Sequence, residues 1–401
     1  MRIGIDARFY GTLGKGLGRY TEKLIEHLEH IDQEHEYVIF LRQENFSEYI
    51  SKNPRFTKKI AQYTWYGLAE QTLFVWQLYS DSFDLVHFPH FNVPLLYRRK
   101  FVVTIHDLIL VHYPTLRNTT RFSFWYWCKF MVYRLVIASA IRRAEHIITV
   151  SQFTKQDILD HYQRSHGKIT VTHEAADDFC HVLFPRDEEA LFSRLGLLSE
   201  KKNGHQRRSY RDIIEPYFLY VGNAYPHKNL TVLFTVARAF PEYRLVLVGK
   251  EDFFYTRLRH EAQKAGIQNI FFVGFVTDQE LSSLYRFARI YLFPSLYEGF
   301  GLPPLEAMAS GTPVVSSSRG SLPEILGDAA LYFDPSSVSQ VLENVRTVLR
   351  NPERKKMMQE RGYRQVARYH FRDMASLTLS IYQTALKNKT VFHDASSFQK
   401  K

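Results

Sequence analysis

The chain has 401 residues, too many for one ordinary hydrophobic core, and at about 100 to 200 residues per domain it predicts two domains. Hydrophobic residues make up 45% and charged residues 23%, which favours a folded globular protein over a disordered or fibrous one. The formal charge of +11 predicts a surface that attracts anions such as phosphates, acidic lipids or nucleic acid, and does not choose among them.

Cysteine usage and the N-terminus indicate the compartment. The sequence has two cysteines, Cys128 and Cys180, which are too few for a disulfide framework. The segment Met1–Arg8 is too short and too charged to be a signal peptide. We therefore expect a cytoplasmic protein in a reducing environment.

Short β-branched runs alternate with helix-like segments through the N-terminal part of the chain. The expected strands are Arg2–Asp6, Tyr37–Leu41, Leu85–Phe88, Phe101–Ile105, His146–Val150 and Lys168–Thr172. This alternation predicts βαβ units around a parallel sheet, and we assign residues 1–190 to this first domain.

A glycine-rich loop follows the first expected strand and opens a helix. Its sequence, Gly14–Tyr20 (GKGLGRY), lets a ligand approach the backbone closely because glycine has no side chain. The spacing differs from the Gly-x-Gly-x-x-Gly of dinucleotide-binding proteins, so a simple connecting turn explains the loop equally well.

His106 and Asp107 lie at the carboxyl end of the fourth expected strand. A single histidine is more often structural than functional, and we interpret His87, His90 and His173 as structural. Asp107 is expected to orient His106.

The longest apolar stretch is Phe122–Ile141, which Lys129 and Arg134 interrupt, and this argues against a membrane span. We prefer a largely buried helix. The alternative is a helix on a membrane surface, with Trp125 and Trp127 in the lipid and basic residues at the headgroups.

A polar, basic stretch between Asp177 and Tyr217, which includes Lys201–Arg208, interrupts the alternation of strands and helices. We interpret residues 191–214 as the linker between the two domains. The adjacent acids Asp177 and Asp178 are expected to be solvated loop residues.

The alternation restarts after the linker. The expected strands are Tyr217–Val221, Arg244–Val248, Ile270–Val273, Ile290–Phe293 and Val314–Ser316. They predict a second parallel sheet, in a domain of residues 215–370. Thr277 and Glu280 have the spacing of a capping box, which marks a helix start. We expect a last helix at about residues 373–386.

The most informative segment is Phe293–Pro313 (FPSLYEGFGLPPLEAMASGTP), a strand end, a glycine loop and a short helix. Prolines suit the first turn of a helix and glycine suits its end, so the helix is expected from about Leu302 to Ser310. Backbone amides at its N-terminus attract anions, and a diphosphate fits there. These amides belong to Gly299, Phe300, Gly301 and Leu302.

Two acids accompany these amides. Glu306 lies one helical turn inside, where its carboxylate can accept hydrogen bonds from ribose hydroxyls, and Glu298 in the loop can face a sugar. Taken singly, each acid is explained equally well as a favourable charge near a helix N-terminus. The neighbouring glycines favour the binding interpretation.

The pattern Glu-Gly-Phe-Gly-Leu-Pro-Pro-Leu-Glu, with seven residues between its glutamates, resembles the retaining glycosyltransferases of family 4. The resemblance covers nearly the whole chain and implies the GT-B fold, in which two Rossmann-like α/β domains with parallel sheets face each other across a cleft. It implies that Glu298 contacts the donor sugar and that Glu306 binds the nucleotide ribose. It also implies that the C-terminal helix packs back on the first domain.

The segment Val221–Asn229 (VGNAYPHKN) also matches the resembled family, and its Lys228 corresponds to the basic residue that binds the donor diphosphate. Gly222 and Asn223 share this donor-binding segment. Family members usually have an arginine near the position of Asn223, so a second cation for the diphosphate is unassigned.

The resemblance gives roles to residues of the cleft as well. It implies that His106 contacts the donor sugar, and that Gly16 and Arg19 lie near the acceptor and the donor phosphate. It implies that the backbone at Phe275 and Val276 meets the nucleotide base. We place Asp107 on the acceptor side of this cleft.

The resemblance implies an enzyme, a hexosyltransferase that retains the anomeric configuration. The motifs look most like those of mannosyl- or rhamnosyl-type members that build surface polysaccharide, so GDP-mannose is the first expected donor, with UDP- and dTDP-sugars next. The expected acceptor is a glycan or a lipid-linked glycan, with peripheral contact at the anionic inner face of a membrane.

No cofactor or metal is expected, because fixed cations and helix dipoles can stabilise the leaving diphosphate. The sequence has no Cys and His residues at zinc-site spacing and no Asp-x-Asp pair in a suitable context.

Two other function classes fit parts of the sequence. A glycoside hydrolase would use Glu298 and Glu306 as its acid and nucleophile, but it would have no use for Lys228 or a phosphate site. A non-catalytic binder of anions or nucleic acid fits the charge, but it predicts interleaved basic and aromatic residues on one surface. The densest basic run lies in the linker instead, so no nucleic-acid partner is expected.

Overall fold

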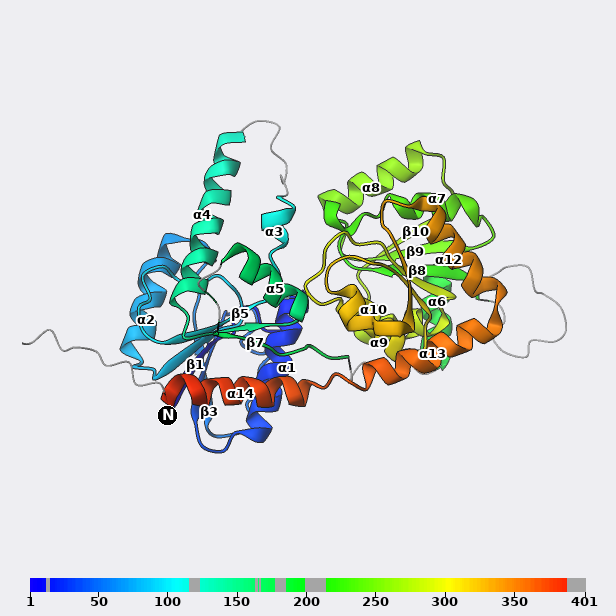
Figure 1. The fold of residues 1–401 in the computed structure, drawn as a ribbon. Helices are drawn as coiled ribbons and strands as arrows, with labels where there is room; N and C mark the ends of the chain where they lie inside the picture. Colours follow the sequence, from blue (N-terminus) through cyan, green and yellow to red (C-terminus); the bar gives the residue numbers. More distant parts are fainter. Residues whose placement is uncertain are drawn as a thin grey trace, which may run out of the picture.

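The computed structural model describes residues 1–11, 15–114, 123–162, 165, 167–176, 185–198 and 214–387. Two α/β domains stand side by side in it (Figure 1). The expected basic run at 201–208, the acids Asp177 and Asp178, and the polar tail from residue 388 lie outside these ranges.

The first domain has a seven-stranded parallel sheet in the order β3-β2-β1-β4-β5-β6-β7. Its strands are β1 (Arg2–Asp6), β2 (Glu36–Leu41), β3 (Phe56–Ile60), β4 (Leu85–Phe88), β5 (Phe101–Ile105), β6 (His146–Thr149) and β7 (Ile169–Val171). Every strand expected from the sequence is confirmed within one residue at each end, whereas β3 was missed.

Helices surround this sheet. They are α1 (Lys15–Ile31), η2 (Glu70–Phe74), α2 (Val75–Ser80), α3 (Ile109–His112), α4 (Ser123–Arg143) and α5 (Gln152–His161). In α1 the apolar residues Tyr20, Leu24 and Leu28 follow a four-residue spacing and are buried, because that spacing puts them on one helix face.

The second domain has a six-stranded parallel sheet in the order β10-β9-β8-β11-β12-β13. Its strands are β8 (Tyr217–Val221), β9 (Arg244–Val248), β10 (Ile270–Gly274), β11 (Ile290–Phe293), β12 (Val314–Ser317) and β13 (Ala330–Phe333). The five expected strands are confirmed within one residue, and β13 was missed. The predicted fold class, two parallel α/β domains, is confirmed.

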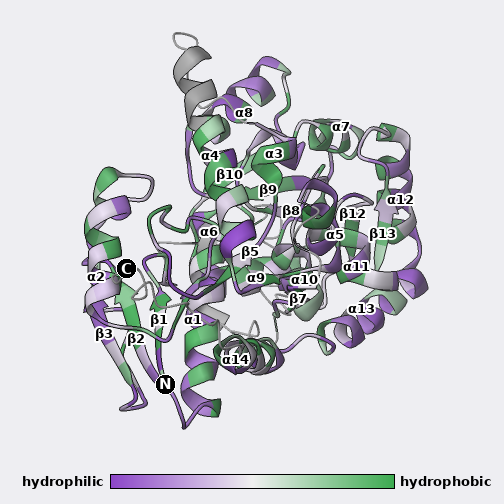
Figure 2. Cartoon of the chain, turned by 60° about the vertical axis from the view of Figure 1, so that its left-hand side comes forward, coloured by the Kyte–Doolittle hydropathy of each residue, from purple (hydrophilic) through white to green (hydrophobic). Residues whose placement is uncertain are grey.

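Helices also surround the second sheet. They are α6 (Pro185–Arg194), η5 (Pro226–Lys228), α7 (Val232–Ala239), α8 (Phe253–Lys264), α9 (Asp278–Phe287), α10 (Leu302–Ala309), α11 (Leu322–Leu326), η6 (Gly327–Ala329), α12 (Val338–Arg350) and α13 (Pro352–Val366). The predicted capping box opens α9, where Thr277 and Glu280 bond each other's backbone amides. The outer helix α13 is largely hydrophilic (Figure 2), and its buried residues Met358 and Val366 belong to the hydrophobic core.

Helix α6 packs on the second domain. The Glu188 carboxylate accepts a hydrogen bond from Ser283 of α9 at 3.1 Å and pairs with Arg286 of the same helix. The predicted boundary at residue 190 therefore falls inside a helix that belongs with the second sheet.

The last helix, α14 (Phe371–Lys387), leaves the second domain and runs along the first, next to α1 (Figure 1). Its buried residues Met374, Thr378 and Tyr382 recur every four positions and form one inward face. The Tyr382 hydroxyl contacts Nδ1 of His87 in β4 at 2.6 Å. The C-terminal helix thus completes the packing of the N-terminal sheet.

Helix α4 differs from the expectation of a largely buried helix. Its second half is buried through Val136 and Ile137, but Met131, Val132 and Leu135 are each at least half exposed. The helix projects away from the sheet (Figure 1), so its middle has no core to cover it. The side chains of Trp125 and Trp127 lie outside the description. Within the described ranges, no helix combines the length and apolar character that a membrane span requires.

Candidate active site

The carboxyl ends of β8, β9 and β10 open on a pocket of about 710 Å³. Parallel sheets bind ligands at this edge because the loops and helix N-termini there point their free amides outward. The residues that line it include Gly222, Asn223, Lys228, Lys250, Phe275, Val276 and Asp278, with Gly16 from the first domain and Pro303 from α10.

Lys228 and Glu298 form an ion pair at this pocket, with 2.6 Å between Lys228 Nζ and Glu298 Oε1. Both side chains are about nine-tenths buried. Lys228 ends the short helix η5, and the next residue, Asn229, has a left-handed φ of 56°. Its amide group donates to the carbonyls of Pro294 and Pro335, which fixes the loop that presents the lysine.

The loop after Glu298 leads into α10, as the sequence predicted. Gly301 precedes the helix with φ 101°, a conformation that favours glycine, and prolines occupy the first turn. The Ser321 hydroxyl donates to the carbonyls of Glu298 and Phe300, at 3.1 and 2.8 Å. This anchoring fixes the loop at the N-terminus of α10, whose free amides can bind an anion.

Glu306 is held from both domains. Its Oε1 accepts from Arg19 of α1 at 2.8 Å, and its Oε2 accepts from the Tyr285 hydroxyl at 3.1 Å. Arg19 therefore reaches across the cleft to the carboxylate that the resemblance assigns to the donor ribose. Burial and Glu306 together raise the pKa of Tyr285 well above its ordinary value, so the tyrosine stays a hydrogen-bond donor.

The two domains touch at Gly299. A Cβ at this position would lie 2.0 Å from the carbonyl oxygen of His106, so the glycine allows the two backbones to meet. The Ser151 hydroxyl of the first domain donates to the Gly299 carbonyl at 2.6 Å, and Thr154 donates to it at 3.3 Å. The glycine loop of the second domain is thereby joined to the strand end that carries His106.

The His106 ring is bound within the first domain. Its Nε2 lies 3.0 Å from the carbonyl of Pro89, which can only accept, and its Nδ1 lies 3.1 Å from Glu174. The ring of Tyr20 packs edge-on against it.

Among the described residues Asp107 makes no hydrogen bond to His106, whose ring nitrogens contact Glu174 and Pro89, and its orienting role stays a prediction. The Asp107 carboxylate accepts from the amide of Ile109, the first residue of α3, at 2.9 Å. An aspartate can satisfy a free amide at a helix start in this way. Burial raises the pKa of Asp107.

Sequence reasoning missed Lys250, which follows Gly249 directly after β9 and lines the same pocket. It is exposed, and it lies among the residues predicted for the diphosphate and base. Its position after a buried strand was the available signal. The pairing of Arg19 with Glu306 left no such signal, because 287 positions separate the two residues.

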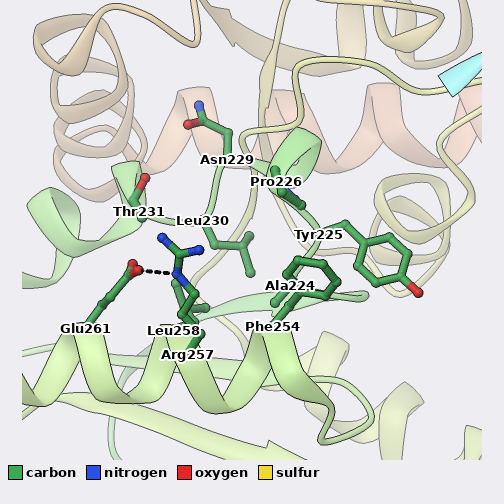
Figure 3. Close-up of a pocket in the computed structure, with 10 residues that line it drawn as sticks. All are labelled: Ala224, Tyr225, Pro226, Asn229, Leu230, Thr231, Phe254, Arg257, Leu258 and Glu261. Atoms are coloured by element: carbon green, nitrogen blue, oxygen red, sulfur yellow. Dashed lines mark hydrogen bonds and ion pairs between the residues drawn. The ribbon is translucent and has the colours of Figure 1, made fainter. Parts of the chain in front are cut away.

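A second pocket, of about 250 Å³, lies between the loop 224–231 and α8 (Figure 3). Tyr225 and Phe254 lie at one end of the labelled group, and the ion pair of Arg257 and Glu261 at the other. None of the predicted site residues lines this pocket.

Comparison with known proteins identifies the family. The model described as "Glycosyltransferase Family 4" matches residues 14–178, and the one described as "Glycosyl transferases group 1" matches residues 206–365. The chain is a family 4 glycosyltransferase. Membership of this family excludes the glycoside hydrolase and the non-catalytic binder as interpretations of the site.

Curated relatives of this glycosyltransferase include mannosyltransferases. It is 27% identical to O-antigen chain mannosyltransferase B of Escherichia coli, over 77% of this chain and 76% of the relative. It is also 27% identical to O-antigen chain mannosyltransferase RfbU of Salmonella typhimurium, over 76% of this chain and 77% of the relative.

Solved structures support the GT-B fold over nearly the full length. Sucrose-phosphate synthase from Thermosynechococcus elongatus matches with a TM-score of 0.72 and 19% identity, over 96% of this chain and 98% of the other. Anabaena HepE in complex with UDP and glucose matches with a TM-score of 0.70 and 16% identity, over 96% of this chain and 99% of the other.

Proposed function

We propose that this glycosyltransferase transfers mannose from GDP-mannose to a glycan or lipid-linked acceptor, with retention of the anomeric configuration and no metal in the reaction. The observation that carries the proposal is the buried pair of Lys228 and Glu298 at the pocket of the second sheet. The O-antigen mannosyltransferases among its relatives support mannose as the sugar and surface polysaccharide as the product.

In this proposal Lys228 exchanges its partner when the donor binds. The lysine moves from Glu298 to the diphosphate, where it stabilises the negative charge that develops as the sugar–phosphate bond breaks. The amides at the start of α10 add a favourable dipole and hydrogen-bond donors. Glu298 is then free to face the sugar ring.

The other end of the pocket favours guanine. Phe275 is 78% exposed and lines the pocket, so its ring is available to stack on a base. The Asp278 carboxylate lines it as well and has no hydrogen-bond partner among the described residues. Guanine offers two adjacent N–H donors to a carboxylate, whereas uracil and thymine offer a single N–H between two carbonyls.

The acceptor side of the proposal uses the charge and the exposed face of α4. Met131, Val132 and Leu135 are exposed on the first domain, and the chain carries a net charge of +11. Exposed apolar residues together with positive charge favour contact with an anionic membrane surface, where a lipid-linked acceptor would be presented.

A donor screen tests the main proposal. Binding and product release are measured with GDP-, UDP- and dTDP-sugars in EDTA, for the wild type, Lys228→Ala and Glu298→Gln. We expect GDP-mannose to bind selectively and transfer to persist in EDTA. Lys228→Ala should weaken donor binding by about 10- to 100-fold through loss of a charged contact. Glu298→Gln should lower kcat by about 100-fold or more.

Lys264→Ala is the matched control, because Lys264 is exposed at the end of α8 and should leave both quantities unchanged. Full turnover by Glu298→Gln would contradict the proposed role of Glu298 in the active site. A chelator-sensitive reaction would contradict the metal-independent mechanism. Selective binding of a UDP- or dTDP-sugar would contradict only GDP-mannose as the donor and would leave the rest of the proposal intact.

The role of Asp278 has a test of its own. In Asp278→Asn the amide can pair with xanthine, which has a carbonyl where guanine has an amino group. The variant should lose affinity for GDP and gain affinity for xanthosine diphosphate, measured by calorimetry. Unchanged GDP affinity would show that Asp278 does not contact the base.

A further inference from the structure

Three side chains with metal-binding atoms meet on the first domain, outside the donor pocket. They are His112 at the end of α3, and Asp157 and His161 of α5, and their ligand atoms all lie within 4.8 Å of one another. Nε2 of His112 is 2.9 Å from Asp157 Oδ1, and Nδ1 of His161 is 3.2 Å from the same oxygen. The geometry points to a binding site for a divalent transition-metal ion at these three residues.

The local structure brings the ligands together in two steps. Asp157 and His161 are four positions apart in α5, so they lie on the same helix face one turn apart. His112 arrives from α3 and faces His161 edge to face, with 5.1 Å between the ring centroids. The sequence spacing of a zinc site is absent because 45 positions separate His112 from Asp157.

The donor set selects the class of metal. Two imidazole nitrogens and one carboxylate oxygen suit Zn²⁺, Co²⁺ or Ni²⁺ rather than Mg²⁺ or Ca²⁺, which prefer oxygen ligands alone. The ligand atoms are already 2.9 and 3.2 Å apart, which is close to the separation around an ion with bonds of about 2.0 to 2.2 Å. When the ion binds, Nδ1 of His161 exchanges its contact with the Asp157 carbonyl for the metal.

An ion can reach the site from solvent. The side chains of His112 and His161 are 32% and 37% exposed, whereas that of Asp157 is 8% exposed. The buried carboxylate supplies a fixed negative charge behind two accessible imidazoles.

The site is connected to the cleft through Tyr297. The Tyr297 hydroxyl donates to Oδ2 of Asp157, and its ring lies 5.0 Å from that of His112. Tyr297 belongs to the second domain and directly precedes Glu298 in the chain. A metal ion on Asp157 therefore changes the charge on the acceptor of the Tyr297 hydrogen bond. This bond joins the two domains next to the candidate active site. The inference does not depend on the identity of the donor.

Cobalt is the probe that tests this site. The full chain is freed of metal with a chelator, dialysed and titrated with Co²⁺, with visible absorption and calorimetry as readouts, and Zn²⁺ is then added in competition. We expect one Co²⁺ per chain, displaced by Zn²⁺, with affinity lowered more than ten-fold in His112→Ala and in His161→Ala. Zn²⁺ should also raise the Tm of the wild type, because a ligand bound to the folded state stabilises it.

The matched control is His173→Ala. His173 has a similar exposed fraction, 35%, and lies 3.1 Å from the single carboxylate of Glu324. Its removal should leave the Co²⁺ affinity unchanged. Failure of the wild type to bind Co²⁺ would overturn the inference, and so would binding that survives both His112→Ala and His161→Ala. Far-ultraviolet circular dichroism of each variant confirms that the loss of binding is not a loss of fold.

Discussion

His87 is a fully buried imidazole between the sheet and the C-terminal helix. Its Nδ1 contacts the Tyr382 hydroxyl at 2.6 Å and its Nε2 contacts Thr104 at 2.8 Å. Burial lowers the pKa of His87 to about 3, so the ring stays neutral in the folded protein. Burial also lowers the pKa values of His90, to about 3, and of His227, to about 4.

These histidines predict acid sensitivity. In the unfolded chain each takes up a proton near pH 6.5, but in the folded protein only near pH 3 to 4. The unfolded state therefore binds more protons in this window, and the free energy of unfolding falls as the pH falls, by about 1.4 kcal/mol per pH unit for each histidine. Urea unfolding at pH 7, 6 and 5 measures the slope.

The variant His87→Gln should have a shallower slope than the wild type, because one titrating group is gone. His30→Gln is the control, since His30 is exposed in the last turn of α1. Equal slopes for His87→Gln and the wild type would show that His87 is not buried as a neutral ring.

For single residues, the sequence predicted several side chains that lie at the pocket. It did not predict which side chains pair with each other. Asn223 and Lys228, which the resemblance to the family assigned to donor binding, line the pocket, and Glu298 pairs with Lys228 there. The contact of Arg19 with Glu306 depends on how two separately folded domains meet. No local pattern encodes that arrangement.

Among the elements, the loop before α10 is packed tightly against the first domain. Gly299 lies against the backbone of His106, and a Cβ there would overlap its carbonyl oxygen. We predict that Gly299→Ala forces the domains apart and lowers kcat/KM by about 100-fold, since a displacement of about 1 Å can have that effect. Binding of GDP to the second domain should be largely unchanged, because the backbone amide of residue 299 remains.

Steady-state kinetics and calorimetry check this prediction. Gly362→Ala is a suitable control, because a Cβ there would lie 3.3 Å from Met308 Cβ, a much milder contact than the 2.0 Å approach to a backbone oxygen at Gly299. Normal transfer by Gly299→Ala would mean that the contact between the two backbones is not needed for the reaction.

The strands that the sequence missed are both at sheet edges. β3 is Phe56–Ile60 (FTKKI), where Lys58 and Lys59 are half-buried and only Phe56 is fully buried, and β13 is the edge strand of the other sheet. Edge strands need little apolar sequence and often carry lysines. The buried central strands, such as β8 and β9, are continuous apolar runs and were therefore recognised.

At the scale of the whole molecule, Glu324 of the second domain joins the two domains by binding the start of α5 in the first domain. Its carboxylate accepts from the amides of Gln152 and Phe153 at the start of α5, and it lies 3.1 Å from His173. Burial alone would raise the pKa of Glu324, but the hydrogen bonds from His173 and the two amides hold it below the ordinary value. The charge therefore persists here at neutral pH and is lost only in acid.

We predict that Glu324→Ala opens the cleft. The first amides of α5 lose their acceptor and the helix dipole loses a favourable charge, effects worth about 0.5 to 2 kcal/mol. Small-angle X-ray scattering should show a larger radius of gyration than for the wild type. Glu261→Ala removes an exposed pair within α8 and should leave the radius unchanged. An unchanged radius for Glu324→Ala would show that other contacts suffice to hold the domains together.

The return of α14 to the first domain sets the order in which the chain can finish folding during synthesis. Domains generally fold as they emerge from the ribosome, starting from the N-terminus. Here the first sheet is made first, but Tyr382, which covers His87, is made only after the second sheet. The second sheet has all its strands once Phe333 has emerged. The domain that is translated first is thus the last to be completed, and a nascent chain that stalls before α14 carries an uncovered first sheet.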